Sequence, residues 1–137
     1  EDPDNSFLGR VIARRRGLPI SLSTLYLLAA WRCGLHLEPI GLPGRFCLGC
    51  FEDREPFFID PFERGRIRSE IEIRQFLSDQ GIDDEESFLM PCPIGEMLQR
   101  FCRNLVHQYT LSSDLHRARQ FAGYIQEFEN AYERESA

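Results

Sequence analysis

Residues 16–34 read RGLPISLSTLYLLAAWRCG, and this stretch decides the fold. Pro19 suits the first turn of a helix, because the N–H group that proline lacks would have no partner there. Gly34 suits the end of the same helix. The apolar residues between them occupy nearly every side of such a helix, which is typical of the centre of a core. We therefore expect a buried helix that starts at Pro19, with Ser21 or Ser23 accepting hydrogen bonds from its free amides.

The neighbouring segments predict a first half that mixes helix and strand. Residues 5–17 (NSFLGRVIARRRG) are expected to form a short helix, capped by Asn5 or Ser6 and ended by Gly17. Three candidate strands follow the buried helix. The first contains a proline, which predicts an edge strand, and the turn between the other two predicts an antiparallel hairpin. These strands are residues 36–42, 45–51 and 56–62.

A further helix and a connector complete this half. Residues 69–81 predict a helix that Ser69 caps and Gly81 ends. Its inward-facing residues are expected to be Ile73, Phe76 and Leu77. Residues 79–93 are acidic and then rich in proline around a cysteine, which is typical of a connector.

The second half is helical. Apolar residues recur at spacings of three and four over residues 94–109, and a similar pattern covers residues 115–128. Asp114 lies between the two and is the expected N-cap of the second helix. A short loop between such helices predicts an antiparallel hairpin. We therefore divide the chain into a core over residues 1–90 and a helical hairpin over residues 91–137, packed on that core.

The composition argues against several classes of function. A net charge of −6 and a pI near 5.1 disfavour general binding to nucleic acids or anionic membranes. The sequence has no Lys, which excludes Schiff-base chemistry and a P-loop lysine. No apolar run approaches the roughly 20 residues of a membrane span. Five cysteines without a secretion signal predict reduced thiols and a cytoplasmic protein. Because the chain begins with Glu1 and not Met, we expect a trimmed fragment.

Three motifs carry a resemblance to a known family. NSFLGRVIARRRGLPISLSTLYLLAAWRCGL, GLPGRF and FFIDPF together resemble the transglutaminase-like core of the bacterial SirB-type proteins. RFCRNLVHQYTLSSDLHRARQF is similar to the C-terminal helical pair of that family, which itself resembles a tetratricopeptide unit. The resemblance covers nearly the whole chain. It implies an α+β, papain-like fold, with a buried helix on a small antiparallel sheet and a C-terminal antiparallel helical hairpin.

The resemblance also implies where a catalytic triad would lie. Active transglutaminase-like enzymes open the buried helix with a catalytic cysteine, and that position matches Pro19. The histidine position matches Arg45, and Asp60 alone remains of the triad. Arginine cannot act as a general base near neutral pH, because its pKa exceeds about 12. If Arg45 and Asp60 lie close together, we expect an ion pair that joins two strands and transfers no proton.

Other candidate sites have simpler interpretations. A serine nucleophile at Ser21 would need a base within about 3 Å. His36, the only histidine of the first half, lies at the far end of the helix, some twenty Å away at 1.5 Å per residue. Cys47 and Cys50 form a CLGC motif on a predicted strand, where positions three apart point to opposite faces. Buried apolar thiols are therefore expected there, without a redox or metal role.

These observations favour a non-catalytic protein. We expect a transglutaminase-like domain that binds a protein or peptide or has a regulatory role, without a cofactor or metal and with no oligomeric state indicated. A groove lined by Ser21, Ser23, Arg45 and Asp60 could receive a carboxylate or a peptide terminus. The alternative is a hydrolase or acyl transferase of the transglutaminase and cysteine-protease superfamily that uses non-standard residues. A third interpretation is a scaffold within a longer chain.

Overall fold

The computed structural model describes residues 2–136 and divides the chain into two compact units. One unit is continuous and runs from Leu18 to Pro93. The other joins the residues up to Gly17 with those from Ile94 onward. The helical pair therefore shares its unit with the N-terminal segment. The predicted domains, residues 1–90 and 91–137, follow a different boundary and stay a prediction about domain organisation.

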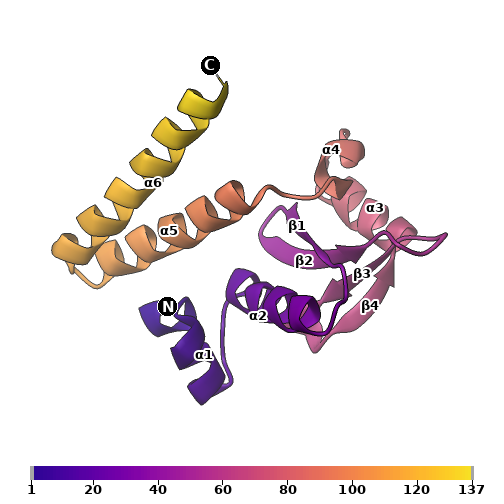
Figure 1. The fold of residues 1–137 in the computed structure, drawn as a ribbon, viewed down its shortest axis with the longest axis horizontal. Helices are drawn as coiled ribbons and strands as arrows, with labels where there is room; N and C mark the ends of the chain where they lie inside the picture. Colours follow the sequence, from indigo (N-terminus) through magenta and orange to yellow (C-terminus); the bar gives the residue numbers. More distant parts are fainter. Residues whose placement is uncertain (1, 137) are drawn as a thin grey trace. The chain divides into compact units, whose positions relative to one another are not determined.

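The continuous unit combines helices with a four-stranded antiparallel sheet (Figure 1). Its strands lie in the order β1-β2-β3-β4, so that each strand pairs with the next one along the chain. This α+β architecture, with a helix on a small antiparallel sheet, is the predicted fold class. The elements are α2 (Pro19–Arg32), β1 (Glu38–Leu42), β2 (Arg45–Cys50), β3 (Phe57–Asp60), η2 (Pro61–Glu63), β4 (Arg66–Ser69), α3 (Glu70–Asp79) and α4 (Glu85–Leu89).

The core of this unit lies between the sheet and helices α3 and α4. Side chains alternate across a strand, and one face of the sheet presents apolar residues from three strands. They pack against both helices, and Figure 1 shows α2 on the other side of the sheet. The cluster consists of Ile40, Leu42, Cys47, Phe58, Ile73, Leu77 and Leu89.

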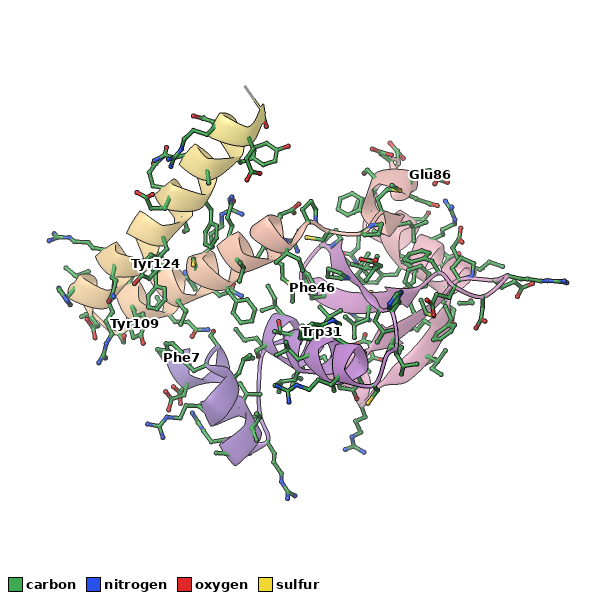
Figure 2. All side chains as sticks on the ribbon, viewed as in Figure 1. Phe7, Trp31, Phe46, Glu86, Tyr109 and Tyr124 are labelled. Carbon is green, nitrogen blue, oxygen red and sulfur yellow. The ribbon has the colours of Figure 1, made fainter. Side chains whose placement is uncertain are left out.

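Helix α2 differs from the prediction of a helix buried on every side. Pro19 occupies its first turn as expected, and the chain leaves the helix at Gly34 with a φ of +73°. However, Leu28 is 43% exposed and Trp31, labelled in Figure 2, is 75% exposed. The described partners of α2 within its unit are β1, β2 and η2, so these short elements cover one side of the helix.

The three predicted strands are confirmed, and a fourth strand was not predicted. The first strand is an edge strand as expected, and the β2–β3 hairpin is antiparallel. The missed strand is β4, whose sequence RIRS alternates arginine with residues that are themselves mostly exposed. Hydrophobic periodicity cannot detect a strand whose two faces are both polar or open to water.

The helix over residues 69–81 is confirmed in detail as α3. The Ser69 hydroxyl accepts from the Glu72 amide at 3.3 Å, and the Glu72 carboxylate accepts from the Ser69 amide at 2.8 Å. This reciprocal arrangement is a capping box. The connector that follows contains a helix that was not predicted, α4, whose N-cap is Asp84.

The second unit consists of η1 (Pro3–Asn5), α1 (Leu8–Arg14), α5 (Ile94–Leu111) and α6 (Leu115–Ser136). The predicted caps of α1 are wrong. Phe7 is its N-cap and makes no side-chain cap hydrogen bond, so neither Asn5 nor Ser6 caps the helix. The helix ends before the predicted Gly17, because Arg15 takes a left-handed conformation with a φ of 53°.

Helices α5 and α6 form the predicted antiparallel hairpin (Figure 1). The Asp114 carboxylate accepts from the Arg117 amide at 3.1 Å, which confirms the predicted N-cap. At the closed end, Tyr109 stacks on Phe121 with ring centroids 5.8 Å apart, beside the buried Leu105 and Ala118. None of the helices described over residues 2–136 has both the length and the apolarity that a membrane-spanning segment requires.

Removing the capping box should destabilise the protein measurably. We expect Ser69→Ala to lower the free energy of unfolding by about 1 kcal/mol, since the Glu72 amide loses the hydroxyl that accepts from it. Ser78→Ala, at an exposed position of the same helix, is the control and should be neutral or slightly stabilising because alanine has the higher helix propensity. Urea titration followed by circular dichroism measures both. Equal midpoints for the two variants would contradict the role of the box.

Candidate functional site

The candidate site forms where β2 begins and β3 ends. Arg45 is the first residue of β2, and Asp60 is the last residue of β3. Asp60 is almost fully buried, with 1% of its surface exposed. The Nη1 atom of Arg45 lies 3.2 Å from Oδ2 of Asp60, so the predicted ion pair between the two strands is confirmed.

The second carboxylate oxygen of Asp60 is bound by the backbone. Oδ1 accepts hydrogen bonds from the amides of Phe62 at 3.1 Å and Glu63 at 3.2 Å. Asp60 is therefore the N-cap of the short helix η2, and Pro61 follows it in the first position, where no N–H is needed. Both oxygens of Asp60 thus hold local structure in place.

Two further charged residues extend the pair into a network of four. The Nη2 atom of Arg45 lies 3.1 Å from Oε1 of Glu63, and Nη2 of Arg68 donates to the other Glu63 oxygen at 2.6 Å. Nε of Arg68 lies 4.0 Å from Oδ2 of Asp60. The more exposed Arg66 also lies near Glu63, with Nη1 3.9 Å from Oε2. Guanidinium groups thus surround the two carboxylates and offset the charge that burial would otherwise penalise. We refer to Arg45, Asp60, Glu63 and Arg68 as the arginine–carboxylate cluster.

Sequence reasoning missed two members of this cluster. Glu63 follows the Asp-Pro step by two residues, and Arg68 lies in the strand that was not predicted. The register places Asp60 opposite Arg66 and Phe58 opposite Arg68. The alternating arginines of RIRS were the available signal, since positions two apart in a strand share a face.

Helix α3 closes one side of the cluster. The guanidinium carbon of Arg45 lies 5.1 Å from the centroid of the Phe76 ring, within the range of a cation–π contact. Arg45 is therefore held by two carboxylates and an aromatic face, and its side chain is 30% exposed.

Cys47 lies on the same strand face as Arg45, two residues further along β2. Burial, together with the nearby negative charge of Asp60, raises the pKa of its thiol to about 12. The thiolate is the reactive form of cysteine, so Cys47 is held in its unreactive form at neutral pH. This agrees with the interpretation of CLGC as apolar thiols, of which Cys50 is half-buried.

The two serines of the predicted groove have other functions than expected. The Ser21 hydroxyl donates to the carbonyl of Leu18 at 3.0 Å, and the Ser23 hydroxyl donates to the carbonyl of Phe46 at 3.3 Å. The prediction that they cap free amides of α2 is therefore wrong, since Leu18 is the N-cap and makes no side-chain cap bond. The Ser23 bond instead ties the helix to strand β2.

Burial limits what a groove at this site could expose. Ser21 and Ser23 are 0% exposed and Asp60 is nearly so. Of the four predicted groove residues, only Arg45 therefore reaches solvent to a substantial degree. The structure brings Arg45 and Asp60 together and directs both serine hydroxyls toward backbone carbonyls.

The remaining candidate residues have other surroundings. Nδ1 of His36 lies 3.1 Å from Oε1 of Glu52, and both side chains are mostly exposed. Cys33 is exposed at the end of α2, whereas Cys92 and Cys102 are buried. Within the part of the chain that the structure describes, no three His, Cys, Asp or Glu residues are placed to hold a metal ion.

Comparison with known proteins gives one family match. Residues 1–103 match the family model described as the transglutaminase-like superfamily. Among curated proteins, the UPF0162 protein of Xylella fastidiosa (strain Temecula1) is 34% identical over 130 residues, which cover 90% of this chain and 46% of that relative. The UPF0162 protein of Vibrio cholerae is 32% identical over 77 residues, or 56% of this chain and 28% of the relative.

A eukaryotic protein also shares part of the sequence. The human F-box only protein 21 is 39% identical over 59 residues, which cover 43% of this chain and 9% of that protein. The match spans about half the length of the first curated relatives, which are the UPF0162 proteins of two Xylella fastidiosa strains. No solved structure matches it significantly.

The charge of Asp60 should stabilise the fold. We expect Asp60→Asn to lower the free energy of unfolding by about 3 kcal/mol, because the amide still accepts from Phe62 and Glu63 but no longer balances the arginines. Asp53→Asn is the matched control, at an exposed position of the β2–β3 loop, and should change stability by no more than about 0.5 kcal/mol. Urea unfolding midpoints measure both variants.

A double-mutant cycle identifies the partner. Arg45→Met and Asp60→Asn should be coupled by about 1 kcal/mol or more, since the two groups are in direct contact. Additive effects of the two substitutions would show that the ion pair contributes nothing.

Cysteine reactivity should follow burial and pKa. In native protein in mildly alkaline buffer, iodoacetamide should modify Cys33 rapidly and Cys47 only after denaturation, because the raised pKa keeps the Cys47 thiol protonated. Peptide mass spectrometry at successive times measures both sites in one sample, and urea-denatured protein is the control in which both react. Equal native rates would contradict the buried position of Cys47.

Proposed function

Because this chain belongs to the transglutaminase-like superfamily, we propose that it is a catalytically inactive member whose core serves protein or peptide interaction. The observation that carries the proposal is the state of Asp60. Its Oδ2 binds Arg45 and its Oδ1 caps η2. In catalysis, a triad aspartate orients the imidazole of a histidine. Asp60 is instead bound to an arginine and to backbone amides, so we infer that it stabilises structure.

The chemistry of the other two matched positions supports the same proposal. Acyl transfer through a covalent intermediate needs a nucleophile and a base that activates it. Pro19 offers no side-chain nucleophile, and the Arg45 guanidinium stays protonated near neutral pH. The nearby thiol of Cys47 cannot substitute readily, because burial raises its pKa to about 12.

The relatives support a narrower form of the proposal. The similarity to UPF0162 proteins of two bacteria is compatible with membership of the SirB-type subfamily. In this proposal α5 and α6 are a tetratricopeptide-like pair. One such pair is too short to form the concave surface that longer repeat arrays use. The protein is proposed to act in the cytoplasm, without a cofactor.

The competing function is that of a hydrolase or acyl transferase with non-standard catalytic residues. For such an enzyme, the candidate hydroxyls near the start of α2 are those of Ser21 and Ser23. Ser21 is fully buried and donates to Leu18. These contacts favour the non-catalytic proposal.

Catalytic assays distinguish the two functions. We expect the purified chain to show no amidase, esterase or amine-incorporation activity above the buffer rate. Ser21→Ala and Asp60→Ala should leave that baseline unchanged, and Ser78→Ala serves as the control variant. A turnover that Ser21→Ala or Asp60→Ala abolishes, while circular dichroism shows folded protein and Ser78→Ala keeps the activity, would overturn the proposal.

A further inference from the structure

Helices α5 and α6 enclose an apolar groove that lies outside the arginine–carboxylate cluster. Its volume is about 410 Å³. Figure 1 shows the two helices diverging from their connecting turn, and the groove opens between them. Its lining is almost entirely apolar and includes Leu98, Phe101, Leu105, Phe121, Tyr124 and Phe128.

Helix α6 leaves most of its apolar surface uncovered. It spans Leu115–Ser136, and Ala118 is its one buried residue within the described part of the chain. Tyr124, labelled in Figure 2, lines the groove and is 45% exposed. Burying apolar surface stabilises by roughly 25 cal/mol per Å², so a helix with such a face gains from a partner.

The charges of α6 point to what that partner is. Its first turns carry Arg117 and Arg119, and its last turns carry Glu133 and Glu135 on either side of one arginine, Arg134. The helix dipole favours the opposite distribution, with acidic residues first and basic residues last. An isolated α6 therefore has an unfavourable charge pattern. At the start of the helix, the N-cap carboxylate of Asp114 offsets part of this cost. At its end, Glu135 takes part in no ion pair among the described residues.

We propose that a second copy of this chain docks its own α6 antiparallel along the groove. Antiparallel packing about a two-fold axis places the basic start of each α6 beside the acidic end of the other. A parallel arrangement would place like charges together. This proposal goes beyond the proposed function and does not depend on it.

The spacing of residues defines a register for the pair. If Arg117 of one copy faces Glu135 of the other, the two-fold axis crosses the pair of helices at the level of residue 126, midway between these two positions. Tyr124 then faces Phe128 across the interface, and all four residues lie on the side of α6 that faces the groove, since they are separated by near-multiples of the helical repeat. Arg117 already binds Asp114 at 3.1 Å, but a guanidinium has five N–H donors and can bind a second carboxylate.

Sedimentation equilibrium over a micromolar to near-millimolar range tests the proposal. We expect the 16.0 kDa chain to reach twice that mass as its concentration rises. Tyr124→Glu should weaken the dimer by about 30-fold or more, because it places a charge in the centre of the interface. Gln126→Glu adds the same charge on the opposite side of the helix and is the matched control.

Charge exchange tests the antiparallel register. Arg117→Glu and Glu135→Arg should each weaken the dimer by about tenfold, since each variant juxtaposes like charges twice. Glu135→Arg improves the match to the helix dipole and should not lower the thermal unfolding temperature. Arg117→Glu also removes the Asp114 ion pair and the contact with the Tyr109 ring, so its dimer is measured at a temperature where circular dichroism shows the variant folded. The double variant Arg117→Glu/Glu135→Arg should restore the dimer, because the two residues lie 18 positions apart in one helix and can meet only between copies.

Three outcomes would overturn the proposal. The first is a monomer at every concentration, which would mean that another part of the chain or a different protein covers the groove. The second is equal weakening by Tyr124→Glu and Gln126→Glu. The third is a double charge variant that dimerises no better than the single ones. None of these outcomes bears on the catalytic assays, so the two proposals fail separately.

Discussion

The buried carboxylate of Asp60 is the constraint on which the sheet end depends. An ionised group with 1% of its surface exposed needs both charge balance and hydrogen bonds. Arg45 and Arg68 supply the first from two different strands, and the backbone amides that begin η2 supply the second. One side chain thereby connects β2, β3, β4 and η2. All of these described contacts hold elements of the fold together.

Much of the fold could be predicted because it rests on local signals. The proline start of α2, the Ser69 cap of α3 and the N-cap at Asp114 each depend on a few adjacent residues, and all three were identified from the sequence. Strand β4 and the exposed side of α2 could not be identified in this way. Their structure depends on what packs against them. The sequence alone does not show that an apolar residue such as Trp31 is exposed in the fold.

The candidate site, too, could be predicted only in part from the sequence. The contact between Arg45 and Asp60 followed from two positions matched to a triad. Glu63 and Arg68 could be assigned to the cluster only from the structure, because η2 and β4 bring their side chains together. The serine hydroxyls were assigned the wrong direction, since a serine in the first turns of a helix either accepts from an amide or donates to a carbonyl, and only tertiary structure decides between them.

The division into two units also sets an order of assembly. Residues 18–93 form contacts within one continuous stretch, so a chain growing from its N-terminus holds all of that unit before α5 exists. The segment up to Gly17 shares its unit with residues that are synthesised after the continuous unit. Its aromatic contact, from Phe7 to Phe121 at a centroid distance of 6.3 Å, closes a loop of more than a hundred residues. During synthesis, α1 can complete its unit only after α5 and α6 have been made.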